Sequence, residues 1–194
     1  MKTTRLETFS DGVLAIILTI MVLALPIPRD DNFDVLEDLF PVFISYILSF
    51  IYIGIYWNNH HHLLQATEKI NGGIMWANLH LLFWLSLIPF VTGWMGLNHF
   101  YKTPVACYGF VLLMSTIAFW ILQRRIIAHN GAESAMAILL SKDYKGKISP
   151  ILYVFGIAGC YFNVWIAGVL YVAVAFMWFI PDRKIEAKIE EMED

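Results

Sequence analysis

The chain has 194 residues, of which 59% are hydrophobic and 15% are charged. A soluble domain averages about 45–50% apolar and about 25% charged residues, so both values indicate an integral membrane protein. The net charge of −3 at pH 7 comes without a basic stripe, which excludes nucleic-acid binding as a main activity. Cys107 and Cys160 lie in apolar runs, so we interpret them as small buried side chains rather than a disulfide or a zinc site.

Six membrane spans are predicted from the apolar runs, because about 20 residues of helix cross a hydrocarbon core of about 30 Å. The first four spans cover residues 9–27, 39–57, 74–97 and 104–122. Residues 148–180 contain no charged side chain and are too long for one span. We therefore predict two short helices there, with a turn near Gly156, Gly159 and residues 161–163.

The distribution of Lys and Arg predicts the orientation, since cytoplasmic loops collect these residues. With both termini in the cytoplasm, 11 of the 13 basic residues lie inside, and only Arg29 and Lys102 lie outside. The acidic first outer loop, residues 29–38, is interpreted as a solvated linker in preference to an acidic vestibule. Residues 128–147 are predicted to be a cytoplasmic connection with a short amphipathic helix, and the residues after Pro181 to continue the last helix or fray.

The polar residues offer no candidate catalytic site. Spans two to six contain no Asp, Glu, Lys or Arg, and Asp11, near the cytoplasmic end, is the only acid in the first span. Transporters of protons or charged substrates usually place such groups near the midplane, so this class loses support. Serine-nucleophile motifs, phosphate-binding glycine loops, paired carboxylates and a Thr-Val-Gly-Tyr-Gly potassium filter are all absent, and we predict no enzyme activity.

Histidine is the remaining residue type that could bind a metal ion or transfer a proton. His60, His61 and His62 are consecutive. Consecutive helical residues point about 100° apart, so these three cannot share one metal ion unless the helix unwinds. We favour solvated or hydrogen-bonded histidines at a helix end, with no metal and no cofactor. His80 falls early in the third span, where burial requires a partner, and a hydrogen bond to another helix is the favoured interpretation.

Residues 5–12 read Arg-Leu-Glu-Thr-Phe-Ser-Asp-Gly, directly before the first apolar run. This segment resembles the RxxxFSD signature of the endolysosomal potassium channel family and its shorter prokaryotic homologues, with Arg5, Phe9, Ser10 and Asp11 at the matching positions. Six spans with cytoplasmic termini agree with one repeat of that family. Residues 57–62 and 86–90 resemble its second and third helices.

The motif has two interpretations. Ser10 and Asp11 can cap the start of a helix, where a carboxylate also complements the helix dipole. The resemblance implies instead a polar network that ties the first helix to its neighbours, and we favour it because an Arg and an Asp at a membrane edge seldom stay unpaired. The implied members are Arg5, Phe9, Ser10, Asp11, His60, His61, His62 and His80.

Ile16, Ile20 and Leu23 recur at i, i+4 and i+7 and so share one helix face. Such a stripe more often packs against other helices than lines a pore. In the resembling channels, however, the first helices surround the pore and form hydrophobic constrictions on the ion path. The resemblance thus implies Ile16 as the innermost ring, with Ile20 and Leu23 above it and the Thr19 hydroxyl near the constriction.

The leading interpretation is a leak-type, potassium-selective channel in which residues 1–194 form one six-helix subunit of a homotetramer. A chain this apolar has no evident water path of its own, so the pore is expected on the symmetry axis of the oligomer. The permeant ion is K⁺ and the expected site is the plasma-membrane bilayer, since a short single-repeat chain looks prokaryotic. Two alternatives remain open: a small-solute secondary transporter or exporter, which needs a midplane polar site, and a structural membrane protein.

Overall fold

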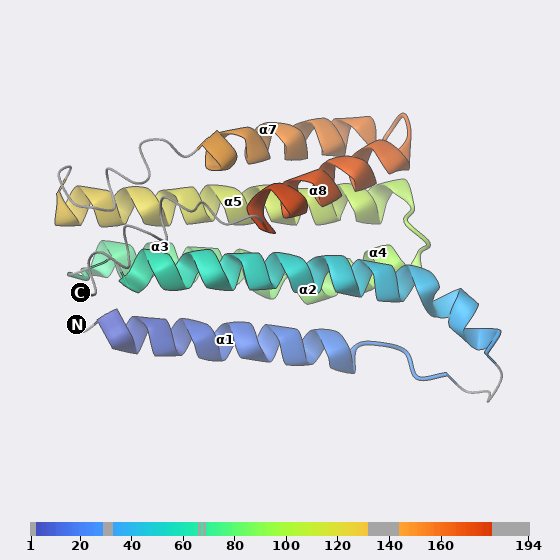
Figure 1. Cartoon of the computed structure of the whole chain (residues 1–194), viewed down its shortest axis with the longest axis horizontal. Coiled ribbons are helices and arrows are strands. Elements are labelled where there is room, and N and C mark those ends of the chain that lie inside the picture. Colours follow the sequence, from blue (N-terminus) through green and yellow to red (C-terminus); the bar gives the residue numbers. More distant parts are fainter. Residues whose placement is uncertain (1–2, 29–32, 66, 68, 132–143, 180–194) are drawn as a thin grey trace.

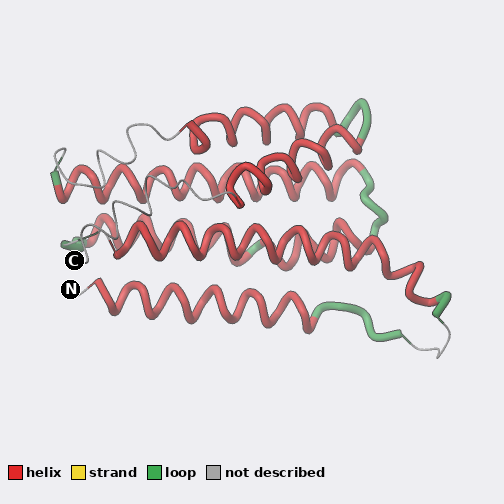
Figure 2. Tube along the Cα trace, viewed as in Figure 1, coloured by secondary structure: helices red, strands yellow, loops and turns green. Residues whose placement is uncertain are grey.

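A computed structural model describes residues 3–28, 33–65, 67, 69–131 and 144–179, and every regular element in this part of the chain is a helix (Figure 1). The helices are α1 (Thr3–Leu23), α2 (Val35–Gln65), α3 (Gly72–Ser86), α4 (Ile88–Leu97), α5 (Lys102–Asn130), α7 (Tyr144–Gly159) and α8 (Val164–Phe179). Short loops join most of them, and strands are absent from the described residues (Figure 2). The predicted all-helical fold class is confirmed.

The helices form one elongated bundle with α1 at one edge and α7 and α8 at the other (Figure 1). α1 packs mainly against α2, α3 and α4. α5 packs against α3 and α4 on one side and against α7 and α8 on the other. Among the described residues, this order leaves α1 covered on one side only.

Four segments are long and apolar enough to cross a membrane: Thr3–Leu23, Leu36–Gln65, Gly72–Leu97 and Lys102–Asn130. They correspond to the first four predicted spans. The apolar stretch that follows is folded back as predicted, with α7 and α8 joined through residues 160–163. Each of these two helices has 16 residues and is about 24 Å long. Gly156 lies inside α7 rather than in the turn.

The third span is one segment in the prediction and two helices in the structure. α3 ends at Ser86 and α4 begins at Ile88, with Leu87 capping both. Pro89 stands in the first turn of α4 and has no N–H to continue the hydrogen bonding of α3. The interruption therefore lies at the one proline in this span.

Two helices extend beyond their predicted apolar ends. α2 has 31 residues and continues through the three histidines to Gln65, and α5 continues to Asn130. A helix of 31 residues is about 46 Å long, more than the hydrocarbon core needs. The backbone bonds of a helix do not require apolar side chains, so hydropathy marks the membrane-embedded part and misses the projecting turns. The predicted amphipathic face (Ala132, Ala135, Met136, Leu139 and Leu140) and the residues after Pro181 lie outside the described residues.

Close helix crossing depends on small residues, and Gly96 on α4 lies directly against the backbone of α2. A Cβ atom at Gly96 would lie 2.5 Å from Ser45 Oγ and 2.8 Å from the Val42 Cα on α2. We expect Gly96→Ala to push the two helices apart and to lower the free energy of unfolding by about 1–3 kcal/mol. Thermal unfolding in detergent measures this change.

Gly93 on the same helix supplies the matched control, because nothing lies within 4 Å of a Cβ there. Gly93→Ala should be neutral or stabilising by up to about 1 kcal/mol, as alanine is the better helix former. Equal unfolding temperatures for the two alanine variants would show that the α2–α4 crossing does not need a glycine.

Candidate ion-conduction site

α1 has two faces of different character. Its buried face is formed by Leu6, Ser10, Leu14, Ile17 and Met21, spaced three or four residues apart. The opposite face holds the predicted constriction residues, with exposed fractions of 60% for Ile16, 49% for Ile20 and 77% for Leu23. Large apolar side chains exposed in a row on a single chain mark a surface for lipid or for another protein copy.

Thr19 lies on the same exposed side of α1. Its hydroxyl donates a hydrogen bond to the Ala15 carbonyl within the helix, at 2.9 Å. The oxygen lone pairs of the hydroxyl remain available on the exposed face. All four predicted constriction residues are therefore exposed on α1 within the described part of the chain.

A buried polar chain connects α1, α3 and α2. Asn78 Nδ2 on α3 donates to Ser10 Oγ on α1 at 2.9 Å, and His60 Nε2 on α2 donates to Asn78 Oδ1 at 2.6 Å. Ser10 also donates to the Leu6 carbonyl at 2.8 Å. Ser10 and Asn78 have no exposed surface and His60 is almost fully buried, so each bond replaces hydration that is lost on folding.

A second, more exposed pair of hydrogen bonds joins the same ends of α1 and α2. Trp57 Nε1 donates to Asp11 Oδ1 at 3.0 Å, and His61 Nδ1 donates to Glu7 Oε1 at 2.8 Å. The two acids are one turn apart on α1, and their partners are one turn apart on the antiparallel α2. The Trp57 and His61 rings stack with an interplanar angle of 21°, which orders this outer layer.

The remaining predicted network residues lie elsewhere. Arg5 and Phe9 are exposed on α1, and Arg5 has no polar partner among the described residues. The His62 ring lies beside that of His61, at a centroid distance of 5.6 Å, and its buried Nδ1 has no partner in the described part of the chain. His80 accepts a hydrogen bond from Trp84 Nε1 at 2.9 Å.

Two details of the sequence interpretation are wrong. Ser10 and Asp11 do not cap a helix start, because α1 already begins at Thr3 and Ser10 bonds back to Leu6 one turn earlier. His80 finds its partner on its own helix α3, four residues away, rather than on another helix. Among the described residues no group of three or more His, Cys, Asp or Glu side chains is arranged to hold a metal ion.

Sequence reasoning missed three members of these contacts: Glu7, Trp57 and Asn78. Asn78 carried the clearest signal, since an uncharged amide within an apolar span needs a buried partner. Glu7 and Trp57 could have been found by aligning α1 and α2 as antiparallel neighbours. The two acids are four residues apart on α1, and their two partners are four residues apart on α2.

The described residues thus define an all-helical, polytopic membrane protein. Its fold matches the crystal structure of a lysosomal potassium-selective channel TMEM175 homologue from Chamaesiphon minutus, with a TM-score of 0.78 and 23% sequence identity over 91% of this chain and 95% of that one. A family model described as "Endosomal/lysosomal potassium channel TMEM175" matches residues 5–89.

Sequence relatives extend the match over the whole chain. A potassium channel of Chryseobacterium sp. (strain P1-3) is 53% identical over 187 residues, which cover 96% of this chain and 97% of the relative. The endosomal/lysosomal proton channel TMEM175 of Gallus gallus is 35% identical over 77 residues, covering 34% of this chain and 15% of that protein. The chain belongs to the TMEM175 family.

Proposed function

We propose that this protein is a leak-type, potassium-selective channel that assembles as a homotetramer, with α1 of each subunit lining a central pore. The single observation that carries the proposal is the exposed apolar stripe of α1, a helix that the described residues of its own chain cover on one side only. The near full-length relative from Chryseobacterium, named as a potassium channel, supports the choice of ion. We propose no enzyme activity and no cofactor.

The pore constriction is proposed to consist of Ile16, Thr19, Ile20 and Leu23 from each subunit. Four isoleucine side chains meeting on an axis leave an opening too narrow for a hydrated cation and offer no oxygen to replace lost water. Such a ring gates by dewetting and steric narrowing. Potassium holds its hydration shell less tightly than sodium, so a ring that forces partial dehydration penalises sodium more.

A second copy of the chain is the proposed occupant of the groove beside this stripe. Val13, Ile16 and Ile20 of α1 form one wall of the groove, and Ser86, Pro89 and Phe90, at the interruption between α3 and α4, form the other. Both walls are predominantly apolar and continuous with the exposed stripe. A neighbouring subunit that packs here would form a heterologous interface, which repeats around the four-fold axis and closes the ring.

Arg5, Phe9, Ser10 and Asp11 are proposed to act as the RxxxFSD signature of the family. In this proposal the buried Ser10–Asn78–His60 chain and the outer pairs of Asp11 and Glu7 fix the cytoplasmic half of α1 against α2 and α3. A rigid support of this kind would hold Ile16 in register on the axis. Arg5 is exposed in a single chain, and in this proposal it contacts a neighbouring subunit or the cytoplasm.

The alternative is a small-solute secondary transporter or exporter. It needs a polar site near the middle of the membrane. In α1 the carboxylates Glu7 and Asp11 lie in the first half of the helix, before the apolar stripe, and in α2 the acids lie in the first turn and the histidines near the last. This distribution favours the channel.

The test of the channel proposal is potassium flux from liposomes that contain the purified protein. With a potassium gradient and a potential-sensitive dye, we expect passive flux that grows linearly with the gradient and needs no second solute. A parallel proton gradient tests the activity for which the Gallus gallus relative is named. Flux that saturates with a solute or requires a co-substrate would favour the transporter, and proton flux without potassium flux would overturn the choice of ion.

The proposed membrane is the cell membrane, with both termini of the chain in the cytoplasm. A cysteine placed at Asp34, just before α2, should react with a membrane-impermeant maleimide added to intact cells. A cysteine placed at Lys145, in the first turn of α7, should react only after the cells are opened. The reverse pattern would overturn the orientation.

A further inference from the structure

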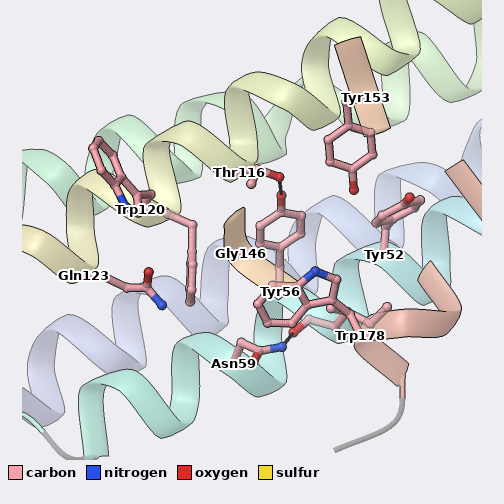
Figure 3. A pocket seen from close by; sticks show the side chains of 11 residues that line it. Tyr52, Tyr56, Asn59, Thr116, Trp120, Gln123, Gly146, Tyr153 and Trp178 are labelled. Atoms are coloured by element: carbon pink, nitrogen blue, oxygen red, sulfur yellow. Dashed lines mark hydrogen bonds between the residues drawn. The ribbon is translucent and has the colours of Figure 1, made fainter. Parts of the chain in front are cut away.

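Two exposed cations lie at one level of the bundle, on the adjacent helices α5 and α7. Gly146 of α7 lines the same internal cavity as Trp120 and Gln123 of α5 (Figure 3). The residues that follow, Lys147 on α7 and Arg124 on α5, are therefore at the same level, and both are exposed. Two positive charges thus occur together on the part of the surface that α5 and α7 share.

Neither cation has an acidic partner within the described residues. α5 and α7 contain no Asp or Glu, and the one ion pair of the described chain joins α1 to α2. Each cation lies instead over an aromatic ring of its own helix. Arg124 Cζ is 4.2 Å from the centre of the Trp120 ring, and Lys147 Nζ is 6.0 Å from the centre of the Tyr144 ring. The rings orient the two side chains but leave their charge without a counter-ion.

An apolar stripe runs along α7 from the level of these cations. Tyr144, Ile148, Ile151 and Phe155 recur at i, i+4, i+7 and i+11, which is one face of the helix, and all four are exposed. Eleven residues of helix rise about 16 Å. This length is about half of a hydrocarbon core of about 30 Å, the depth that the acyl chains of one leaflet occupy. α7 lies at the edge of the bundle opposite α1 (Figure 1), so the stripe faces lipid.

The cations and the stripe together fit one class of molecule. A phosphate accepts charge-assisted hydrogen bonds from a guanidinium and from an ammonium group. Basic sites between membrane-embedded helices hold anionic lipid headgroups, and Trp and Tyr are enriched at the depth of those headgroups. A free phosphate would leave the stripe unused, and a neutral lipid would leave the cations without a counter-ion.

We propose that Arg124 and Lys147 bind the phosphate of an anionic glycerophospholipid, and that one acyl chain of this lipid lies along Ile148, Ile151 and Phe155 of α7. The site uses no residue of α1, so neither its occupancy nor its test depends on the proposed pore. A lipid bound in this way links α5 to α7. Because it binds only the folded bundle, it should also raise the unfolding temperature.

The test uses the full-length protein in detergent with added dioleoylphosphatidylglycerol. Native mass spectrometry measures the lipid bound, and thermal unfolding measures the stabilisation. Dioleoylphosphatidylcholine is the matched lipid, because it has the same acyl chains and no net charge. We expect saturable binding of the anionic lipid, at least five-fold tighter than that of the neutral one. Equal binding of the two lipids would overturn the site.

Arg124→Gln combined with Lys147→Gln removes both charges and keeps the stripe. This double variant should bind phosphatidylglycerol at least ten-fold more weakly, at the level of phosphatidylcholine. Lys69→Gln combined with Arg125→Gln is the matched control, since it removes two exposed cations from the same end of the bundle, and Arg125 points about 100° away from Arg124 around α5. The control should bind like the unmodified protein. Equal losses in the two double variants would reveal general attraction to positive charge and would overturn the site.

Glycerol 3-phosphate separates a lipid from a soluble phosphate, because it has the headgroup phosphate without acyl chains. It should displace phosphatidylglycerol only at concentrations at least a hundred-fold higher than those of the lipid. Displacement at equal concentration would overturn the lipid as the ligand. If the double variant of Arg124 and Lys147 does not fold, Lys147→Gln alone should still weaken phosphatidylglycerol binding at least three-fold, and unchanged binding would overturn the site.

Discussion

Ile16→Asn is expected to raise the permeability of sodium relative to potassium several-fold. The asparagine side chain is smaller than that of isoleucine, so four of them would leave a wider opening. Its amide oxygen can also replace water around an ion. The proposed ring would become wider and wetter, and the dehydration cost that discriminates against sodium would fall. Ile16 is 60% exposed on α1 and is not among the buried core residues of the described chain, so the substitution should leave the fold intact. Bi-ionic reversal potentials in planar bilayers measure the permeability ratio.

Leu18→Asn is the control for this experiment. Leu18 lies on another side of α1, half-buried against the core of its own subunit. An amide there should lower the yield of folded protein and leave the permeability ratio of the surviving channels unchanged. An Ile16→Asn channel with the potassium preference of the unmodified protein would remove Ile16 from the proposed filter.

Asn78→Leu is expected to cause the largest loss of stability among the polar residues. Leucine has a similar volume but cannot form hydrogen bonds. The His60 Nε2 donor would therefore lose its acceptor, and Ser10 Oγ would lose the hydrogen bond that Asn78 donates. Both groups have almost no exposure to solvent. Each buried group without a partner costs about 1–3 kcal/mol, so we expect a total of about 2–4 kcal/mol. Thermal unfolding of the purified protein, together with its elution volume as an oligomer, measures the effect.

Trp57→Phe provides the comparison, since it removes the outer hydrogen bond to Asp11 and keeps an aromatic ring. Trp57 is about half exposed, and water can replace its bond to the carboxylate, so the loss should stay within about 1 kcal/mol. If Asn78→Leu unfolds at the same temperature as Trp57→Phe, the buried chain of Ser10, Asn78 and His60 is not what fixes α1.

Hydropathy predicted the helical spans well because each span is a nearly continuous apolar run. The turn between α7 and α8 was predictable for the same reason: no single helix of that length fits a bilayer. The break between α3 and α4 was not predicted, since Pro89 does not change hydropathy and its effect depends on a hydrogen bond of the preceding helix. The projecting ends of α2 and α5 were missed because polar turns can remain helical outside the bilayer.

Side-chain pairing was harder to predict than the spans. Periodicity correctly grouped Ile16, Ile20 and Leu23 on one face of α1, but it could not tell whether that face meets its own chain, lipid or another subunit. The partners of Ser10 and Asp11 depend on which helices are neighbours and on how far those helices are shifted along the bundle axis relative to α1. For that reason Asn78 and Trp57, rather than His80 or Arg5, complete the contacts seen in the structure.

The most direct test of the pore is chemical access to a cysteine at position 16. In a background where Cys107 and Cys160 are replaced by alanine, we predict that Ile16→Cys channels lose their potassium current when Cd²⁺ or a small thiol reagent is added. Ile17→Cys, one residue along and buried against its own subunit, should be unaffected. An unchanged current in Ile16→Cys channels whose thiol is shown by mass spectrometry to have reacted would contradict the proposal that this face of α1 lines the pore.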